Sequence, residues 1–522
     1  MSFVSNPVVT LNIIPRDAQV GLEDRRALLI GQTTTAGAWT TGLYRDMPRT
    51  AAEINAMFGA RSHLAQIARA FREVNPVTNV DAIALADNGS GTSGTAVCVF
   101  AGTATAARTI YVSVASAEND RYEINIEIGD TAAAVGAKLL ALAQADTSAP
   151  FTAALTTATV TFTAANKGTA CNTWLISVLD QYDRPAIVPG LTYTLTGWAG
   201  GATNPILTTL FDEVQNLRYQ DIVYPEAYTS SYLYNFINSR KNVDNDVKDG
   251  TAYRYVTDTF SNVKALALSL NSSEIVLLSN KANSAPYWIG PHIPEMPDVQ
   301  AARFAAAVSR RFEDQISISD LVVTNEPLDQ FGGMDKAALP LFNTPLLYTR
   351  VPLKGSGYSE PEQRELQDSG ITVIGGNRQN NAVIMGVVVT TWQNDSAGNA
   401  DDTWKYLEWR QTHGVIREYL VRNCRKQFSQ YRLSSGIPVP GYSIATEAVI
   451  RAFLYLLYDQ LSDLALTVKG RDARKYFEDN LVVTIKPALR RVEISADAPM
   501  MSQLGAIIGS VKFNFAPGGA MA

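Results

Sequence analysis

The chain has 522 residues, of which 46% are hydrophobic and 18% are charged, with a net charge of −6. This length predicts roughly three or four domains, and the composition is that of a folded, soluble protein. The acidic balance argues against a dedicated nucleic-acid binder, which carries an excess of Lys and Arg.

The cysteines and the hydropathy pattern argue against a disulfide-rich secreted protein and against a membrane protein. Cys98, Cys171 and Cys424 lie far apart, so they predict no disulfide framework and fit a chain that folds in a reducing cytosol. The N-terminal residues lack the basic start and continuous apolar run of a signal peptide. The longest apolar stretch, around "AVIMGVVVTTW", is well short of the ~20 residues that a membrane span needs. We therefore expect no membrane insertion.

Residues 1–25 predict an extended arm. The segment "VVTLNII" is rich in β-branched residues and is bracketed by two prolines, which predicts a short strand with no partner nearby in the sequence. The residues that would pair with another strand are Val8, Val9, Leu11 and Ile13.

An α/β region follows over residues 26–87. "RALLIG" and "VDAIALAD" predict buried strands. "PRTAAEINAMFG" begins a helix with a capping box, because Thr50 and Glu53 stand three residues apart. "SHLAQIARAFREVNP" has apolar residues at helical spacing and ends at Asn75, before a proline, which predicts a second, amphipathic helix.

Residues 88–202 differ in composition, with few charges and many Thr, Ala and Gly residues. They predict short alternating strands in "TIYVSVAS", "YEINIEIG", "ATVTFTA", "WLISVL" and "TYTLTG", and one helix around "DTAAAVGAKLLALAQ". Glycine-rich stretches, "DNGSGTSG" and "GWAGGATNP", lie at the two junctions and are typical of linkers. The block is therefore predicted to be an inserted β-rich domain.

The remaining chain returns to an α/β pattern. "NPILTTLFDEVQNLRYQDIVYPE" predicts a helix and then a strand, "NAVIMGVVVTTW" predicts a strand, and "NLVVTIKPALRRVEISADAP" predicts further strands. Two long amphipathic helices are expected over residues 401–431 and 442–466. Their inward-facing residues are predicted to be Trp409, His413, Ile416, Leu420 and Cys424 on the first helix, and Val449, Phe453, Leu456, Leu457 and Leu461 on the second.

The last twelve residues, "VKFNFAPGGAMA", predict one more strand. Val511, Phe513 and Phe515 alternate with polar residues, which is the period of a half-buried strand. The chain ends directly afterwards, so this strand, like the one near the N-terminus, has no obvious partner in its own sequence.

Motifs for catalysis or ligand binding are weak. Gly89, Gly91 and Gly94 match G-x-G-x-x-G, but a strand-like segment follows where a dinucleotide site needs a helix, so a linker is the favoured interpretation. No P-loop pattern and no G-x-S-x-G elbow occurs. We expect no enzymatic activity and no cofactor.

Metal-binding patterns are equally poor. Asp244, Asp246 and Asp249 precede Gly250 at spacings that do not match an EF-hand, and a solvated polar loop is favoured. The three histidines, His63, His292 and His413, have no second histidine or cysteine at metal-ligand spacing. No metal site is expected.

Two basic clusters stand out in this acidic chain. Each is either a solvated helix face or a surface that contacts an acidic protein. The first comprises Arg417, Arg422, Arg425, Lys426 and Arg432, and the second comprises Lys469, Arg471, Arg474 and Lys475.

Two terminal strands without partners point to self-assembly. Unpaired strand edges are a liability in a monomer, whereas a strand donated to a neighbour's sheet completes that sheet. Head-to-tail donation between copies builds rings or helical arrays. The residues alone therefore predict a self-assembling structural protein.

The sequence resembles the tail sheath proteins of contractile phage tails, particularly the Mu-like branch. The resemblance is strongest over residues 371–516, through "GITVIGG", "VVVTTW", "DDTWKYLEWRQTHGVIREYLVRNCRKQF" and "LVVTIKPALRRVEISADAPMMSQLGAIIGSVKFNF". It also covers "AAEINAMFGARSHLAQIARAF" and, in the inserted block, "GTATAARTIYVSV", "GDTAAAVGAKLLALAQ" and "VTFTAANKGTACN". Residues 285–350 depart from the family's pattern.

This resemblance implies a multidomain α+β subunit. Copies would stack as six-fold rings around a tail tube, meet baseplate and tail terminator proteins, and contract to drive the tube through the host envelope for genome ejection. The protein would assemble in the host cytoplasm and belong to the virion, without direct contact with nucleic acid and without insertion into a membrane. Lys469, Arg471, Arg474 and Lys475 are the expected tube contacts.

The predicted domains follow the same resemblance. A middle α/β domain comprises residues 26–87 and 203–380, the inserted outer domain comprises residues 88–202, and the inner sheath domain comprises residues 381–507. Arms that donate strands comprise residues 1–25 and 508–522. Three alternatives stay open: the sheath of a related injection machine or bacteriocin, an adhesin built on the Thr-rich insert, and a nucleotide-binding enzyme.

Overall fold

The computed structural model describes residues 25–115, 121–182, 184–207, 211–240, 248–279, 296–316, 341, 344–349, 357–377, 381–436, 442–464, 466–486 and 490–500. Both predicted terminal strands lie outside these ranges, as do His292, Asp244 and Asp246. The strand residues concerned are Val8, Val9, Leu11, Ile13, Val511, Phe513 and Phe515.

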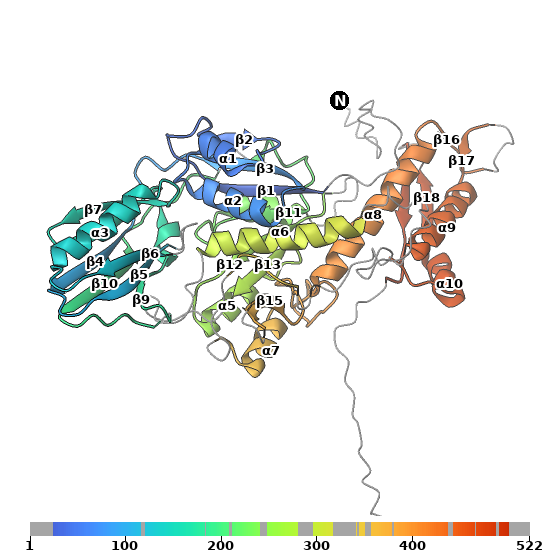
Figure 1. The fold of residues 1–522 in the computed structure, drawn as a ribbon. Helices are drawn as coiled ribbons and strands as arrows, with labels where there is room; N and C mark the ends of the chain where they lie inside the picture. Colours follow the sequence, from blue (N-terminus) through green and yellow to red (C-terminus); the bar gives the residue numbers. More distant parts are fainter. Residues whose placement is uncertain are drawn as a thin grey trace, which may run out of the picture.

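A large sheet forms the centre of the molecule (Figure 1). Its eight strands run in the order β15-β14-β13-β12-β11-β1-β3-β2. The strands from β14 to β3 are parallel, and β15 and β2 are antiparallel at the two edges. The bounds are β1 Arg26–Gln32, β2 Gly42–Tyr44, β3 Asn79–Leu85, β11 Asp221–Val223, β12 Thr251–Tyr255, β13 Ile275–Ser279, β14 Ile371–Gly376 and β15 Ala382–Met385.

Helices cover both faces of this sheet, as expected for parallel strands that are apolar on both sides. Along β1, Ala27 and Leu29 join one hydrophobic core and Leu28 and Ile30 join the other. One face carries α1 Ala51–Phe58, α2 His63–Val74 and α6 Pro297–Ile316, and the other carries α4 Ser231–Asn238, α5 Phe260–Leu270 and α7 Glu360–Asp368.

The two helices predicted in the first α/β region are confirmed, but the capping box is incomplete, because the Glu53 carboxylate accepts from the Thr50 hydroxyl. Thr50 caps α1 by accepting a hydrogen bond from the backbone N–H of Glu53, and Ser62 caps α2 in the same way. Asn75 terminates α2, as predicted. These caps satisfy N–H groups that a helix start leaves unpaired.

The inserted block forms two antiparallel sheets, β10-β4-β8-β7 and β6-β5-β9, with α3 packed against them. The predicted strands and helix are confirmed, and β7 is an addition that the sequence pattern did not reveal. The bounds are β4 Thr95–Gly102, β5 Arg108–Val114, β6 Tyr122–Ile126, α3 Ala132–Ala145, β7 Phe151–Thr156, β8 Thr159–Ala164, η1 Thr169–Thr173, β9 Ile176–Leu179 and β10 Leu191–Ala199.

The two junctions of the insert are ordered against each other. Thr92 forms a β-bridge with Ala202. The carboxylate of Asp87 accepts hydrogen bonds from Gln32 Nε2 at 2.7 Å and from Asn166 Nδ2 at 2.9 Å. The buried core also runs without a break from α2 into the insert. The insert is therefore docked on the α/β region at both junctions.

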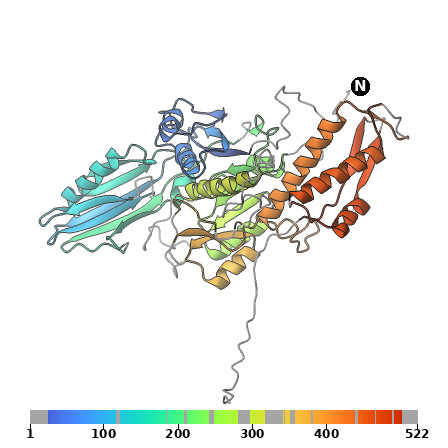
Figure 2. The same ribbon diagram turned by 45° about the vertical axis from the view of Figure 1, so that its right-hand side comes forward.

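The C-terminal region lies at the opposite end of the large sheet from the insert (Figures 1 and 2). Both predicted long helices and the predicted strands after them are present. The bounds are α8 Leu407–Phe428, β16 Arg432–Leu433, β17 Ile444–Ala445, α9 Glu447–Asp463, α10 Arg471–Asn480, β18 Val482–Lys486 and β19 Arg491–Ser495.

One predicted helix is wrong. Residues 211–217 form turns before β11 rather than a helix. The buried guanidinium of Arg240 donates to the carbonyl oxygens of Val214 and Leu217. The Val214 carbonyl also accepts the backbone N–H of Leu217, so a turn and the Arg240 side chain together satisfy these carbonyls in place of a helical ladder.

The predicted faces of the C-terminal helices need correction. On α9, Leu457 and Leu461 are buried as expected, but Leu456 is 51% exposed and Val449 and Phe453 are only half-buried. On α8, Ile416 is buried, while the other four predicted residues are half-buried. The buried apolar residues of α9 are Ile450, Leu454, Leu457, Tyr458 and Leu461.

Strand β15 belongs to the large sheet, where it pairs with β14 from Met385 opposite Val373 to Ala382 opposite Gly376. The sequence pattern placed this segment at the start of the inner domain. In the described part of the chain, no helix is long and apolar enough to cross a membrane.

Candidate assembly site

In the described part of the chain, the hairpin β18–β19 is a two-stranded sheet. Val482 lies opposite Ser495 at one end and Lys486 opposite Arg491 at the other. Within the residues that the structure describes, no third strand joins either edge. A two-stranded hairpin is marginally stable alone, and each edge presents a row of unpaired backbone groups.

One face of this hairpin packs against α9 and α10. Val483 is buried there, and Ile485 and Val492 are half-buried in the same cluster. Ile494 is paired with Val483 and so shares its face, yet Ile494 is 42% exposed. Val483, Ile485, Val492 and Ile494 form the apolar layer of the hairpin, and this layer is incompletely covered at the β19 edge.

The other face of the hairpin is polar. Lys486 Nζ lies 2.6 Å from Glu493 Oε2, and Arg491 also pairs with Glu493. Hydrogen bonding from Lys486 lowers the pKa of Glu493, and Arg491 adds to the effect. A strand added beside β19 would thus need apolar residues on alternate positions to match the packed face.

The second predicted basic cluster lies around α10 and is balanced by carboxylates. Lys469 Nζ is 2.7 Å from Asp463, and Lys475 Nζ is 2.9 Å from Asp479. Arg474 pairs with Asp459 and with Glu478, at 2.5 and 2.9 Å. These groups are at the surface, where ion pairs exchange readily with water and with other partners.

Buried ion pairs hold the first part of α8 against the large sheet. Arg410 and Arg417 lie 2.8 and 3.0 Å from the carboxylate of Asp249, and Arg218 pairs with Glu418. Burial would raise the pKa of Asp249, but the nearby guanidinium groups of Arg410 and Arg417 lower it below its usual value. The expectation that Asp249 lies in a solvated loop is wrong, because it is 5% exposed.

Two further titratable groups lie on the same helix. Glu408 Oε1 accepts a hydrogen bond from the backbone N–H of Leu341 at 3.2 Å, and burial raises the pKa of Glu408 to about 7. The ring of His413 packs against Trp404, with centroids 4.9 Å apart. Burial, reinforced by Arg410, lowers the pKa of His413 to about 4, so this histidine is neutral at neutral pH.

The first predicted basic cluster is therefore divided. Arg417 faces inward and pairs with Asp249, and Arg422 Nη1 lies 3.8 Å from Glu418. Lys426 and Arg432 are exposed beyond this network. The sequence alone does not separate the buried basic residues from the exposed ones, because Asp249 and Arg218, which pair with residues of α8, lie far away in the sequence.

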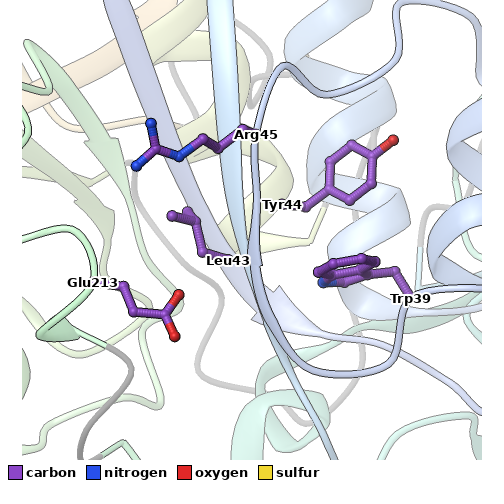
Figure 3. A pocket seen from close by; sticks show the side chains of 5 residues that line it. All are labelled: Trp39, Leu43, Tyr44, Arg45 and Glu213. Carbon is purple, nitrogen blue, oxygen red and sulfur yellow. The ribbon is translucent and has the colours of Figure 1, made fainter.

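One open cavity of about 690 Å³ lies beside β2 (Figure 3). Leu43 and Arg45 lie on the side of Glu213, and Tyr44 and Trp39 lie on the other side of the strand. These five lining residues include no Ser, Thr, Cys, Lys or His.

The glycine motif gives no nucleotide site either. Gly94 is followed at once by β4, whereas a pyrophosphate site needs a helix N-terminus at this point. Among the described residues, no group of His, Cys, Asp and Glu could hold a metal ion.

Comparison with known proteins shows that this chain is similar to tail sheath proteins. A curated relative, the Mu-like prophage FluMu tail sheath protein of Haemophilus influenzae, is 24% identical over 420 residues, which cover 78% of this chain and 77% of the relative. The resemblance that the sequence indicated is thus confirmed. No family model matches the chain.

Two solved structures are also similar. A sheath tail protein from Listeria innocua has a TM-score of 0.45 with 11% identity, and the match covers 92% of both chains. A sheath tail protein from Desulfitobacterium hafniense has a TM-score of 0.44 with 8% identity, covering 94% of this chain and 100% of the other. Likeness at this level is weak and carries no argument about function.

Proposed function

We propose that this chain is the structural subunit of a contractile phage tail sheath. Copies polymerise as stacked six-membered rings around a tail tube, and their contraction drives the tube through the host envelope for genome ejection. The subunit is a virion component that assembles in the host cytoplasm and meets baseplate and tail terminator proteins at the ends of the tail. The similarity to the FluMu sheath protein supports this proposal.

The observation that carries the proposal is the unfinished hairpin β18–β19. No other strand in the described ranges pairs with its edges, and its apolar layer is incompletely covered at Ile494. The predicted strand at residues 511–515 alternates Val511, Phe513 and Phe515 with polar residues, which is the pattern that this layer accepts. A donated strand from each of two neighbours, one N-terminal and one C-terminal, would convert the hairpin into a four-stranded sheet.

The energies of strand donation fit a stable assembly. Each backbone hydrogen bond that a donated strand forms contributes about 0.5–1.5 kcal/mol net. Burying a phenylalanine side chain such as Phe513 contributes a further ~1.5–3 kcal/mol. Several such bonds per arm, with two buried rings from the C-terminal arm and aliphatic side chains from the N-terminal arm, link copies into a continuous mesh.

The tube contact is proposed to lie on α10 and the loop before it. Lys469, Arg471, Arg474 and Lys475 lie there, and three of them form surface ion pairs. Because such pairs are weak and exposed, a tube surface with suitable carboxylates could take over these cations. The inner domain, residues 381–507 in the sequence prediction, would then face the tube.

Electron microscopy of the purified full chain tests the proposal, with paired variants of the terminal strand. Wild type is expected to form hollow tubes with a six-fold cross-section. Phe513→Asp/Phe515→Asp should remain unassembled at an unchanged melting temperature, since a charged side chain cannot enter the apolar layer.

The matched control is Lys512→Asp/Asn514→Asp, which changes the same strand on its polar face and should still form tubes. Tubes formed equally well by the phenylalanine variant would contradict strand donation. Wild-type protein that stays monomeric at high concentration would contradict the sheath proposal itself.

A further inference from the structure

The chain enters the large sheet at Arg25, directly before β1. The guanidinium of Arg25 forms a two-point ion pair with Asp221 of β11, with both the Nε–Oδ2 and the Nη2–Oδ1 distances at 2.7 Å. The two side chains are 5% and 0% exposed. Such paired guanidinium–carboxylate contacts are strong and fix direction as well as distance.

Contacts from three other elements fix the same pair. The hydroxyl of Tyr253 on β12 donates to Asp221 Oδ1 at 3.1 Å. The Arg25 guanidinium lies 5.2 Å from the ring centroid of Phe312 on α6. Arg25 Nη1 also donates to Gln411 Oε1 on α8, at 3.4 Å. One side chain thus connects β11, α6 and α8 at the start of β1.

The location of Arg25 matters more than its contribution to stability. A buried ion pair is weak evidence for stability, because desolvation offsets much of the attraction. Residues 1–24 join the sheet here, and β1 lies between β11 and β3 in the middle of it. The helix that Arg25 contacts, α8, leads to the region that contains the hairpin β18–β19.

We propose that Arg25 is a positioning residue that anchors the N-terminal arm under tension. This inference rests on the proposed donation of that arm to a neighbour. Tension on the arm reaches the sheet at Arg25, where Asp221 resists displacement of β1 along its axis. The contact with Gln411 passes part of the force to α8 and so to the hairpin, which holds the arm of another copy.

Single-molecule pulling on the full chain tests the anchor directly. The chain is tethered through Ser2→Cys in the arm and Leu268→Cys on α5, where Leu268 is 53% exposed. Arg25→Gln and Asp221→Asn are each expected to lower the first rupture force by at least one third. The rupture force of the double variant should equal the lower of the two single-variant forces, because both changes break the same ion pair. Arg25→Lys, which keeps the charge but loses the two-point geometry, should lie between.

The matched control is Arg72→Gln. Arg72 is also buried, and its guanidinium donates to the carbonyl oxygens of Met47 and Thr78. Its loss should lower the melting temperature without lowering the rupture force at the arm. An equal fall in rupture force for Arg72→Gln, or no fall for Arg25→Gln, would overturn the proposal.

A second readout uses assembled tubes. Arg25→Gln tubes should form normally but break into short pieces when contraction is induced, whereas wild-type and Arg72→Gln tubes remain whole. Unbroken Arg25→Gln tubes would overturn the anchor. A wild-type chain that forms no tubes would overturn the sheath function instead, and the pulling experiment would still decide whether Arg25 anchors the arm.

Discussion

Asp249 shows how single residues attach α8 to the rest of the molecule. Its carboxylate lies within 3.0 Å of two guanidinium groups, those of Arg410 and Arg417. The sequence around it, "DNDVKDG", is typical of a solvated loop, and nothing local reveals that Arg410 lies opposite, 161 residues further along the chain. Pairing of this kind could not be predicted, because it depends on how the elements pack.

Removing the Asp249 carboxylate should therefore be costly. We expect Asp249→Asn to lower the free energy of unfolding by about 3–5 kcal/mol, since Arg410 and Arg417 lose the carboxylate that they share and Arg410 is left with the longer contact with Glu274, at 3.5 Å. Urea unfolding of the full chain measures this. Asp479→Asn, which removes an exposed partner of Lys475, is the control and should change stability little. Equal effects of the two substitutions would argue against a buried network at α8.

Glu408 should make stability depend on pH. Its folded-state pKa, about 7, lies above the ordinary 4.5, so the folded protein binds this proton more tightly than the unfolded chain does. The resulting stabilisation is complete below pH 4.5 and is lost as the pH rises through 7. Glu408→Gln should not show this loss of stability. The difference in unfolding free energy between wild type and variant should therefore change by on the order of 3 kcal/mol between pH 4.5 and 8.

The measurement is denaturant unfolding of both proteins across this pH range. Glu360→Gln, at an exposed position on α7, serves as the control and should give a curve parallel to that of wild type. Parallel curves for Glu408→Gln as well would show that the Glu408 carboxyl is not held in a buried, protonated state.

At the scale of elements, helix caps and hydrophobic periodicity predicted the helices and strands that depend on neighbouring residues alone. The cap at Thr50 placed the first helix, apolar spacing and the stop at Asn75 placed the second, and alternation placed the strands of the insert. In the segment "NPILTTLFDEVQNLRYQDIVYPE", where a helix was predicted before the strand, residues 211–217 form turns, and the Arg240 side chain donates to the carbonyls of Val214 and Leu217. Sequence pattern alone carries no sign of that contact.

The inward face of α9 illustrates a second limit. Apolar residues occupy almost every side of this helix, including both Leu456 and Leu457, so periodicity cannot choose its buried face. In the structure the hairpin, α8 and α10 pack around α9, and Leu457 is 2% exposed whereas Leu456 is 51% exposed.

Alanine substitutions at these neighbouring leucines test this orientation. Leu457→Ala is expected to cost about 2–5 kcal/mol, because it leaves a cavity in the core. Leu456→Ala should stay within about 0.5 kcal/mol of wild type. Chemical unfolding of the unassembled chain gives both values. A larger loss of unfolding free energy for Leu456→Ala than for Leu457→Ala would contradict the orientation of α9 described here.

At the scale of the whole molecule, the class of fold was predictable and the arrangement was not. Composition and periodicity indicate a multidomain chain with mixed helices and strands and a β-rich block in the middle, and the resemblance to sheath proteins is confirmed. How β15 joins the large sheet, and how Asp87 and Asn166 dock the insert, depend on contacts between segments far apart in the sequence. The exact domain boundaries therefore stay predictions.

Among the residues that the structure describes, no third strand pairs with either edge of the hairpin β18–β19, and the account places strands of neighbouring copies there. A high-resolution cryo-electron microscopy structure of the assembled full chain tests it most directly. We expect one additional strand along each edge of the hairpin, traceable to residues 8–14 of one neighbouring copy and residues 511–515 of another. Edges that remain bare, or that are filled by the terminal segments of the same molecule, would contradict the account.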